Sequence, residues 1–215
     1  MQMKFYSQYK QDEILYNKYF NRVKDGYFIE IGAHDGSYLS NTLFYEETLN
    51  WKGLCIEPHP VLFKKCLERR KCISLPYAVT DSEGIQLFLQ VPEKRGDALS
   101  GIVTNYHPNH FNDIARNTDI SGNTTIVNTK SLQAILDNTN VKEVHYLSID
   151  TEGSELQVIK GINFEKVFIH VIEIENNYPD IFQPIEKILL DNGFVKSETV
   201  MCDEIFINSK SFLYT

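Results

Sequence analysis

Basic residues are scarce in this 215-residue sequence, which has 21 Lys and Arg against 29 Asp and Glu and a formal net charge of −8. Nucleic-acid binders and binders of anionic membranes present a basic surface, so we expect neither kind of partner. No stretch approaches the roughly 18 consecutive apolar residues of a membrane span, and the N-terminus has no apolar signal core. We therefore expect no membrane span and a soluble, cytoplasmic protein.

Paired cysteines are also lacking. The four cysteines stand at positions 55, 66, 72 and 202, and none belongs to a C-x-x-C pair. That spacing is typical of zinc ribbons and thioredoxin-like sites, so neither is supported. Cys55 lies in the apolar run Leu54-Cys55-Ile56, which predicts a small buried side chain in a reduced compartment.

Strand-length apolar runs alternate with helical patterns along most of the chain. This order is typical of a parallel sheet wrapped by helices, and the length predicts one domain, 1–215, with an N-terminal helical segment, 1–25. The predicted strands are Tyr27–Ile31, Gly53–Glu57, Ile73–Val79, Ile85–Leu89, Thr124–Val127, Val144–Ile149 and Val167–Ile174, followed by an antiparallel hairpin of Phe194–Val200 and Glu204–Asn208. The predicted helices are Gln11–Phe20, Ser40–Thr48, Pro60–Glu68, Lys130–Asp137, Ser154–Lys160 and Gln183–Asp191.

The first strand leads into a glycine-containing turn, residues 30–37, with the pattern E-x-G-x-x-x-G. A strand that ends in such a turn lets a ligand approach the backbone and the following helix. A dinucleotide site would have glycine where Glu30 stands, because a carboxylate there repels a pyrophosphate. It favours an ammonium group, and S-adenosylmethionine carries one beside its sulfonium. The alternative is an ordinary strand-to-helix turn.

The second and third strands end in residues that suit an adenine nucleoside. Glu57 stands 27 residues after Glu30, and an acid at this strand end can accept hydrogen bonds from both ribose hydroxyls. The alternative for Glu57 is an acid at a helix start, since Pro58 follows. Ala78 and Val79 could hold the edge of an adenine ring.

Acids also follow the predicted strands Val144–Ile149 and Val167–Ile174, at the end of the sheet where open α/β folds bind ligands. The first of these strands leads into Asp150, Glu152 and Glu155, and the second ends near Glu173 and Glu175. A capped helix start with acids near the helix dipole explains Glu155. It leaves Asp150 and Glu152 without a structural reason.

Taken together, these motifs resemble the FkbM family of S-adenosylmethionine-dependent methyltransferases. The resemblance runs from Ser7–Asp12 through Phe28–Gly36 and Ile56-Glu57-Pro58, and its most specific part is the D-x-E-G-x-E element at 150–155 followed by Lys160-Gly161. It implies a Rossmann-like class I methyltransferase fold, with a mostly parallel seven-stranded sheet, a C-terminal antiparallel hairpin and helices on both faces. It also implies methyl transfer to a hydroxyl. The expected cofactor residues are Glu30, Gly32, Ala33, His34, Asp35, Gly36, Ser37, Asn41, Glu57, Pro58, Ala78, Val79 and Asp150.

The acceptor is expected to be a sugar or glycan hydroxyl; the alternatives are a natural-product or other small-molecule hydroxyl, or a non-catalytic module that binds S-adenosylmethionine. A nicotinamide-dependent enzyme is disfavoured by Glu30. A base near the oxygen would speed transfer, and Asp150, Glu152 and Glu175 are the candidates, with His107 or His110 as the other option. In a metal-assisted version, Mg²⁺ would be held by Asp150, Glu175 and Asn176, a placement that resembles catechol-type O-methyltransferases.

Residues 90–128 break the alternation of strands and helices. They are polar and contain Gly, Asn, Pro and two histidines. A long irregular insertion in a compact domain is usually a lid or substrate loop, and otherwise a disordered excursion. We expect it to border the acceptor site rather than the cofactor, through Tyr106, His107, Asn109 and His110.

Overall fold

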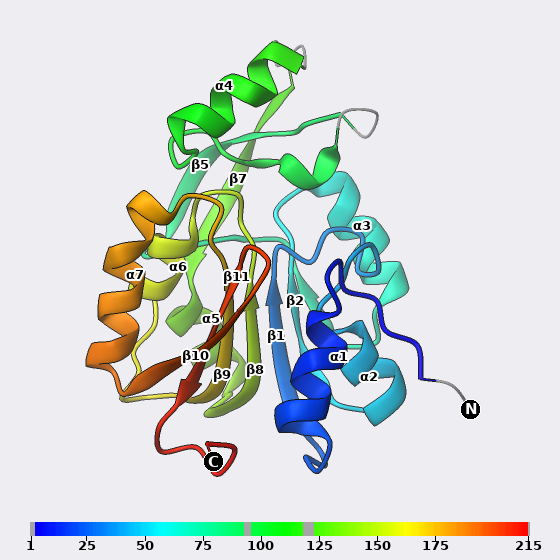
Figure 1. The fold of residues 1–215 in the computed structure, drawn as a ribbon. Helices are drawn as coiled ribbons and strands as arrows, with labels where there is room; N and C mark the ends of the chain where they lie inside the picture. Colours follow the sequence, from blue (N-terminus) through cyan, green and yellow to red (C-terminus); the bar gives the residue numbers. More distant parts are fainter. Residues whose placement is uncertain (1–2, 93–95, 118–122, 215) are drawn as a thin grey trace.

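The computed structural model describes residues 3–92, 96–117 and 123–214. A seven-stranded sheet forms its centre, with strand order β10-β11-β9-β8-β1-β2-β3 (Figure 1). The strands are parallel except β11, which runs antiparallel to both of its neighbours. Across the sheet they are β10 (Phe194–Val200), β11 (Asp203–Asn208), β9 (Phe168–Glu175), β8 (Glu143–Ile149), β1 (Tyr27–Ile31), β2 (Lys52–Ile56) and β3 (Ile73–Leu75).

Helices cover both faces of this sheet. One face carries α1 (Gln11–Leu15), the π-helix η1 (Tyr16–Phe20), α2 (Leu43–Leu49) and α3 (Pro60–Arg69); the other carries α5 (Leu132–Thr139), α6 (Glu155–Lys160) and α7 (Pro179–Asp191). This order and layering is the Rossmann-like class I methyltransferase fold, as predicted. No helix among the described residues is long and apolar enough to cross a bilayer.

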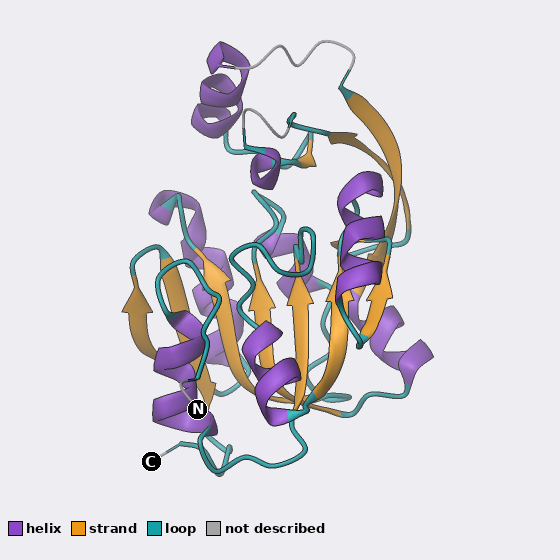
Figure 2. Cartoon of the chain, turned by 90° about the vertical axis from the view of Figure 1, so that its right-hand side faces the viewer, coloured by secondary structure: helices purple, strands orange, loops and turns teal. Residues whose placement is uncertain are grey.

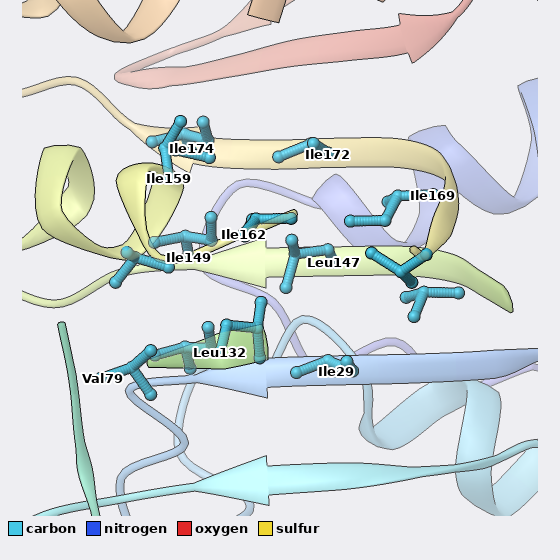
Figure 3. Packing of buried hydrophobic residues seen from close by; sticks show 14 of the residues in the cluster. Ile29, Val79, Leu132, Leu147, Ile149, Ile159, Ile162, Ile169, Ile172 and Ile174 are labelled. Atoms are coloured by element: carbon cyan, nitrogen blue, oxygen red, sulfur yellow. The ribbon is translucent and has the colours of Figure 1, made fainter. Parts of the chain in front are cut away.

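Alternation along the strands produces two hydrophobic cores. Ile29 and Ile31 of β1 pack with the residues of α5, α6 and α7, and Figure 3 shows part of this aliphatic core. Phe28, which directly precedes Ile29, points to the opposite face and joins an aromatic core with Phe20 and Tyr45. Burial on both faces keeps the central strands rigid, so their carboxyl ends form a firm edge on which to build a site.

A second, four-stranded sheet lies beyond the carboxyl ends of the main strands (Figure 2). Its order is β4-β7-β5-β6, with strands β4 (Ala78–Thr80), β7 (Thr124–Ser131), β5 (Gly84–Leu89) and β6 (Gly101–Ile102). The 3-10 helix η3 (Asp97–Leu99) and the helix α4 (Pro108–Asn117) accompany it. The expectation of an irregular segment over 90–128 is therefore wrong in its described parts, which have their own small cores around Phe88 and Tyr106.

The predicted strand Ile73–Val79 is also wrong, because it is two strands in two sheets. β3 ends at Leu75 and β4 begins at Ala78. Pro76 has no backbone N–H to donate to a ladder, so the strand ends there and the chain turns into the second sheet. Similarly, β7 extends to Ser131, whose side chain caps α5, so this helix begins at Leu132 rather than Lys130.

Candidate active site

The site begins where β1 and β8 end side by side. Gly32 follows β1 with φ +86°, and a Cβ on it would lie 1.8 Å from the backbone oxygen of Asp150. Asp150 in turn donates its backbone N–H to Ile31 O at 3.1 Å. Glycine is required here because the two chains touch through their backbones, and this contact places Asp150 beside the turn after β1.

A large cavity opens at these strand ends. Ten of the predicted cofactor residues line this cavity: Glu30, Gly32, Ala33, His34, Asn41, Glu57, Pro58, Ala78, Val79 and Asp150. The structure also brings in residues that the sequence analysis did not assign to the site: Gln8, Gln11, Tyr38, Leu39, Tyr77, Asp97, Ser100, Cys202 and Asp203. Gln8 and Gln11 lie in the N-terminal motif that carried the family resemblance, which was a usable signal. Cys202 and Asp203 reach the cavity because β11 folds back beside β9. No local sequence pattern predicts this pairing.

Glu57 is held at the end of β2 by backbone donors. His34 N donates to its Oε2 at 2.8 Å and His59 N donates to its Oε1 at 2.7 Å. Burial raises the pKa of Glu57 to about 8 even though these bonds favour the charged form. Each oxygen has a remaining lone pair for a ligand hydroxyl.

Glu30 has a different environment from the one expected. Its carboxylate accepts hydrogen bonds from Ser40 Oγ, Asn41 N and Thr42 Oγ1, and Arg70 Nη1 lies 2.9 Å from Oε2. The Arg70 side chain is fully buried and also pairs with Glu46. Glu30 is therefore occupied by protein donors, and it anchors the β1–α2 loop (residues 32–42) rather than offering a free charge to a ligand ammonium.

Asn41 carries an unused acceptor beside the cavity. Its Nδ2 donates to Ser148 Oγ at 3.1 Å and Glu173 Oε1 at 2.6 Å, which fixes the orientation of the amide. Its Oδ1 is buried and accepts no hydrogen bond from any described residue. A buried acceptor of this kind is costly unless a ligand or water supplies a donor.

Three predicted cofactor residues lie off the cavity lining. Asp35 Oδ1 accepts hydrogen bonds from the backbone N–H groups of Ser37 and Tyr38, so it closes the turn on itself. Gly36 packs against α3 and Arg70. Asp35, Gly36 and Ser37 therefore shape the β1–α2 loop.

Asp150, Glu152 and Glu175 come together as a cluster of carboxylates. One oxygen from each lies within 4.8 Å of the others. Burial, together with repulsion from neighbouring acids, raises the pKa of all three. Asp150 opens into the large cavity, whereas Glu152 is only 9% exposed.

The D-x-E-G-x-E element builds this cluster through its own loop. Glu155 Oε1 accepts hydrogen bonds from the backbone N–H groups of Thr151 and Gly153, which folds the chain so that Glu152 turns inward. Gly153 has φ +121°, and a Cβ on it would lie 2.5 Å from Asn105 O. Glycine therefore lets the segment before α4 dock on the carboxylate loop, where Asn105 also donates to Ser154 Oγ.

A second cavity adjoins the cluster on its other side. It is lined by His107, His110, Glu152, Gly153, Glu155, Glu175, Asn176, Asn177, Tyr178, Ile181, Phe182 and Ile185. The His107 and Tyr178 rings stack with centroids 3.9 Å apart. Glu152 and Glu175 line both cavities, so these two carboxylates stand between them.

Described residues of the segment 90–128 line both cavities. Asp97 and Ser100 line the large cavity, and Asp97 Oδ1 lies 3.1 Å from His34 Nε2. Of the residues predicted to contact an acceptor, His107 and His110 line the second cavity. Tyr106 does not, because its ring is buried in the core of the insertion and its hydroxyl donates to Leu99 O.

Asn176, predicted as a metal ligand, lies at the edge of the cluster. Its Nδ2 donates to Glu204 Oε1 at 3.1 Å, and its buried Oδ1 accepts no hydrogen bond from a described residue. Asn109 lines neither cavity. The stacked ring of Tyr178 was missed by the sequence analysis because it belongs to the start of α7, whose pattern indicates only an amphipathic helix.

Fold and site together define a Rossmann-like protein with a large cavity at the carboxyl edge of its sheet. The model of the methyltransferase FkbM domain matches residues 30–196, most of the chain, and the protein belongs to this family. It is an S-adenosylmethionine-dependent methyltransferase. No curated protein sequence matches the chain significantly.

The chain is similar to several solved methyltransferases at low identity. One is precorrin-6y C5,15-methyltransferase from Geobacter metallireducens GS-15, with 12% identity, a TM-score of 0.44 and coverage of 91% of this chain and 85% of that one. Another is the N-terminal domain of human METTL16, with 11% identity, a TM-score of 0.46 and coverage of 92% and 65%. A methyltransferase from Pyrococcus furiosus has 11% identity, a TM-score of 0.41 and coverage of 91% and 80%.

Proposed function

We propose that the protein transfers a methyl group from S-adenosylmethionine in the large cavity to a sugar hydroxyl that enters through the second cavity. The observation that carries this proposal is the position of Glu152 and Glu175, which line both cavities. A donor on one side and an acceptor on the other would meet at these carboxylates.

The large cavity fits the cofactor chemically. Glu57 offers carboxylate lone pairs to ribose hydroxyls, and Ala78 and Val79 offer an apolar wall to an adenine ring. The free Oδ1 of Asn41 can accept a hydrogen bond from the amino-acid ammonium. When bound, S-adenosylmethionine supplies a methyl group on a sulfonium, which needs no activation as a leaving group.

The carboxylate cluster would remove the acceptor proton. The pKa of Glu152 and that of Glu175 are raised, so their ionised forms are stronger bases than an exposed glutamate. Glu152 Oε2 accepts no hydrogen bond from a described residue, and the nearest partner is His110 Nδ1 at 3.4 Å. Burial lowers the pKa of His110, so this imidazole is neutral at pH 7 and leaves the carboxylate free to act.

The lining of the second cavity narrows the acceptor class. Its described residues include no Lys or Arg but do include Glu152, Glu155 and Glu175. A phosphorylated or carboxylated acceptor would be repelled there. The stacked rings of His107 and Tyr178 suit the C–H face of a neutral sugar, and Asn176 and Asn177 offer amide groups to its hydroxyls.

A metal-assisted version is the second candidate. Asp150, Glu152 and Glu175 present three carboxylate oxygens within 4.8 Å of one another, a hard oxygen set of the kind Mg²⁺ prefers. The ion would lower the pKa of an acceptor hydroxyl. This version differs from the predicted set because Glu152 takes the place given to Asn176.

Turnover to S-adenosylhomocysteine with a panel of neutral sugars tests the proposal. We expect a neutral sugar to support turnover, and we expect Asp150→Asn and Glu175→Gln to lower it while the fold is retained. Calorimetry should detect S-adenosylhomocysteine but not NAD. Full activity in EDTA would exclude the metal-assisted version, and turnover only with phosphorylated acceptors would contradict the proposed acceptor class.

A further inference from the structure

Three of the four cysteines gather behind the β1–α2 loop. Cys55 lies on β2, Cys66 lies in α3, and Cys72 directly precedes β3; all are free thiols. Cys72 Sγ donates a hydrogen bond to Cys55 Sγ at 3.5 Å, and Cys55 Sγ donates to Glu30 Oε2 at 3.8 Å. Two thiols therefore form a chain of weak hydrogen bonds that ends on the carboxylate anchoring the loop.

The two linked thiols differ in access. Cys55 is fully buried, whereas Cys72 is half-buried. Their sulfur atoms have about 1.5 Å to travel to reach the bonded distance of a disulfide. The oxygen of Glu30 that accepts from Cys55 Sγ also pairs with the buried guanidinium of Arg70, so the thiol chain ends on the charge network that holds the β1–α2 loop.

We propose that Cys55 and Cys72 form a reversible disulfide when a peroxide oxidises the protein, and that this bond weakens cofactor binding through Glu30. In the first step the Cys72 thiol loses its proton and its sulfur attacks a peroxide oxygen, the O–O bond breaks, and the departing hydroxide takes that proton, which gives a sulfenic acid and one water. In the second step Cys55 attacks the Cys72 sulfur, the S–O bond breaks, and the departing hydroxide takes the thiol proton as water. Two thiols and one hydrogen peroxide give one disulfide and two waters.

The bond would act on the cofactor site through shared contacts. Oxidation removes the thiol donor to Glu30 Oε2, the oxygen that also pairs with Arg70. It also pulls on the backbone at residue 72, whose N–H donates to Glu46 Oε1. The backbone N–H of Asn41 donates to Glu30, so Glu30 orients Asn41, which lines the proposed cofactor cavity. Losing about one neutral hydrogen bond in this network corresponds to affinity that is about threefold to tenfold weaker.

Peptide mapping of the full chain after peroxide treatment tests the bond itself. Trypsin places the three cysteines in separate peptides, 53–64, 66–69 and 72–94. We expect a cross-linked pair of 53–64 with 72–94, a mass lower by two hydrogens, and reversal by dithiothreitol. Cys72→Ser should abolish this pair, and the matched variant Cys66→Ser, a buried neighbour in α3, should retain it.

Calorimetry with S-adenosylhomocysteine tests the coupling. We expect the peroxide-treated protein to bind it about threefold to tenfold more weakly than the reduced protein, with no change for treated Cys72→Ser. A sulfinic acid on Cys72 without a cross-link would overturn the proposal, as would a cross-linked protein with unchanged affinity. The coupling rests on the proposed cofactor site. If the reduced protein failed to bind S-adenosylhomocysteine, that site would be wrong, while the peptide map would still decide whether the disulfide forms.

Discussion

Two groups of carboxylates border the central sheet, and they differ in what surrounds them. Glu30 and Glu46 share the buried guanidinium of Arg70. Asp150, Glu152 and Glu175 have no ion pair with a described Lys or Arg, and their pKa values are raised. The first group is neutralised within the protein and holds a loop. The acids of the second group have disfavoured ionised forms, and a protein tolerates such an arrangement where a ligand or a reaction uses it.

The largest expected effect is on the neutralised group. Arg70→Met leaves two buried carboxylates without a cation, so we expect the free energy of unfolding to fall by about 3–5 kcal/mol. Urea unfolding of the wild type and the variant measures this loss of free energy. Arg69→Met is the matched control, because its pair with Glu47 is partly exposed and should contribute less than about 1 kcal/mol. Equal losses for the two variants would contradict the role given to Arg70.

The opposite pattern is expected for the second group. Glu152→Gln should lower kcat by about a hundredfold, near the lower end of the effect of general acid–base catalysis. It should not lower the free energy of unfolding, because it removes a carboxylate that is repelled by Asp150 and Glu155. Glu165→Gln, on the exposed surface, is the matched control. A Glu152→Gln variant that loses stability but keeps kcat would place Glu152 with the structural carboxylates.

Glu57 shares one feature with each group. Protein donors hold its carboxylate, as they hold Glu30, but it has no neighbouring cation among the described residues. Glu57→Gln should weaken S-adenosylmethionine binding by about 1.5–3 kcal/mol. The ribose hydroxyls bind the ionised form, and the pKa of Glu57 is raised to about 8. Affinity should therefore rise as the pH increases through 8, and this rise should vanish in the variant. Calorimetry between pH 6.5 and 9, in roughly half-unit steps, measures both effects; a wild-type affinity independent of pH would remove Glu57 from the ribose site.

The comparison also shows which features a sequence can reveal. Glu57, Asp150 and Glu175 are placed by a general rule, because the ends of parallel strands share one edge of the sheet. The role of Glu30 is set by Arg70, forty positions later at the end of α3, and such a pairing depends on how a helix packs rather than on a motif. Tyr106 is similar, since its polar neighbours suggested a contact residue while tertiary packing buries it.

The second sheet was missed for a related reason. Its strands β5 and β7 were recognised individually, but they pair across a polar segment that has no hydrophobic periodicity of its own. The bend at Pro76 that sends β4 into this sheet is visible only as one proline in an apolar run. The sequence thus predicts the main sheet well because burial on both faces imposes a strong pattern, and the accessory sheet poorly because exposed strands carry a weak one.

The smallest expected effect concerns the second cavity. His107→Ala removes the ring that stacks on Tyr178, so we expect the acceptor KM to rise about threefold to tenfold, in line with the contribution of one aromatic pair. Cofactor affinity should not change, because His107 does not line the large cavity. Asn109→Ala, two residues further along in α4, is the matched control, since Asn109 lines neither cavity and the backbone N–H at this position still donates to Nδ1 of His107 in this variant. Steady-state kinetics with varied acceptor and saturating cofactor measures the effect. If the cofactor Kd rose while the acceptor KM held, the second cavity would belong to the cofactor, and Glu152 and Glu175 would no longer separate a donor side from an acceptor side.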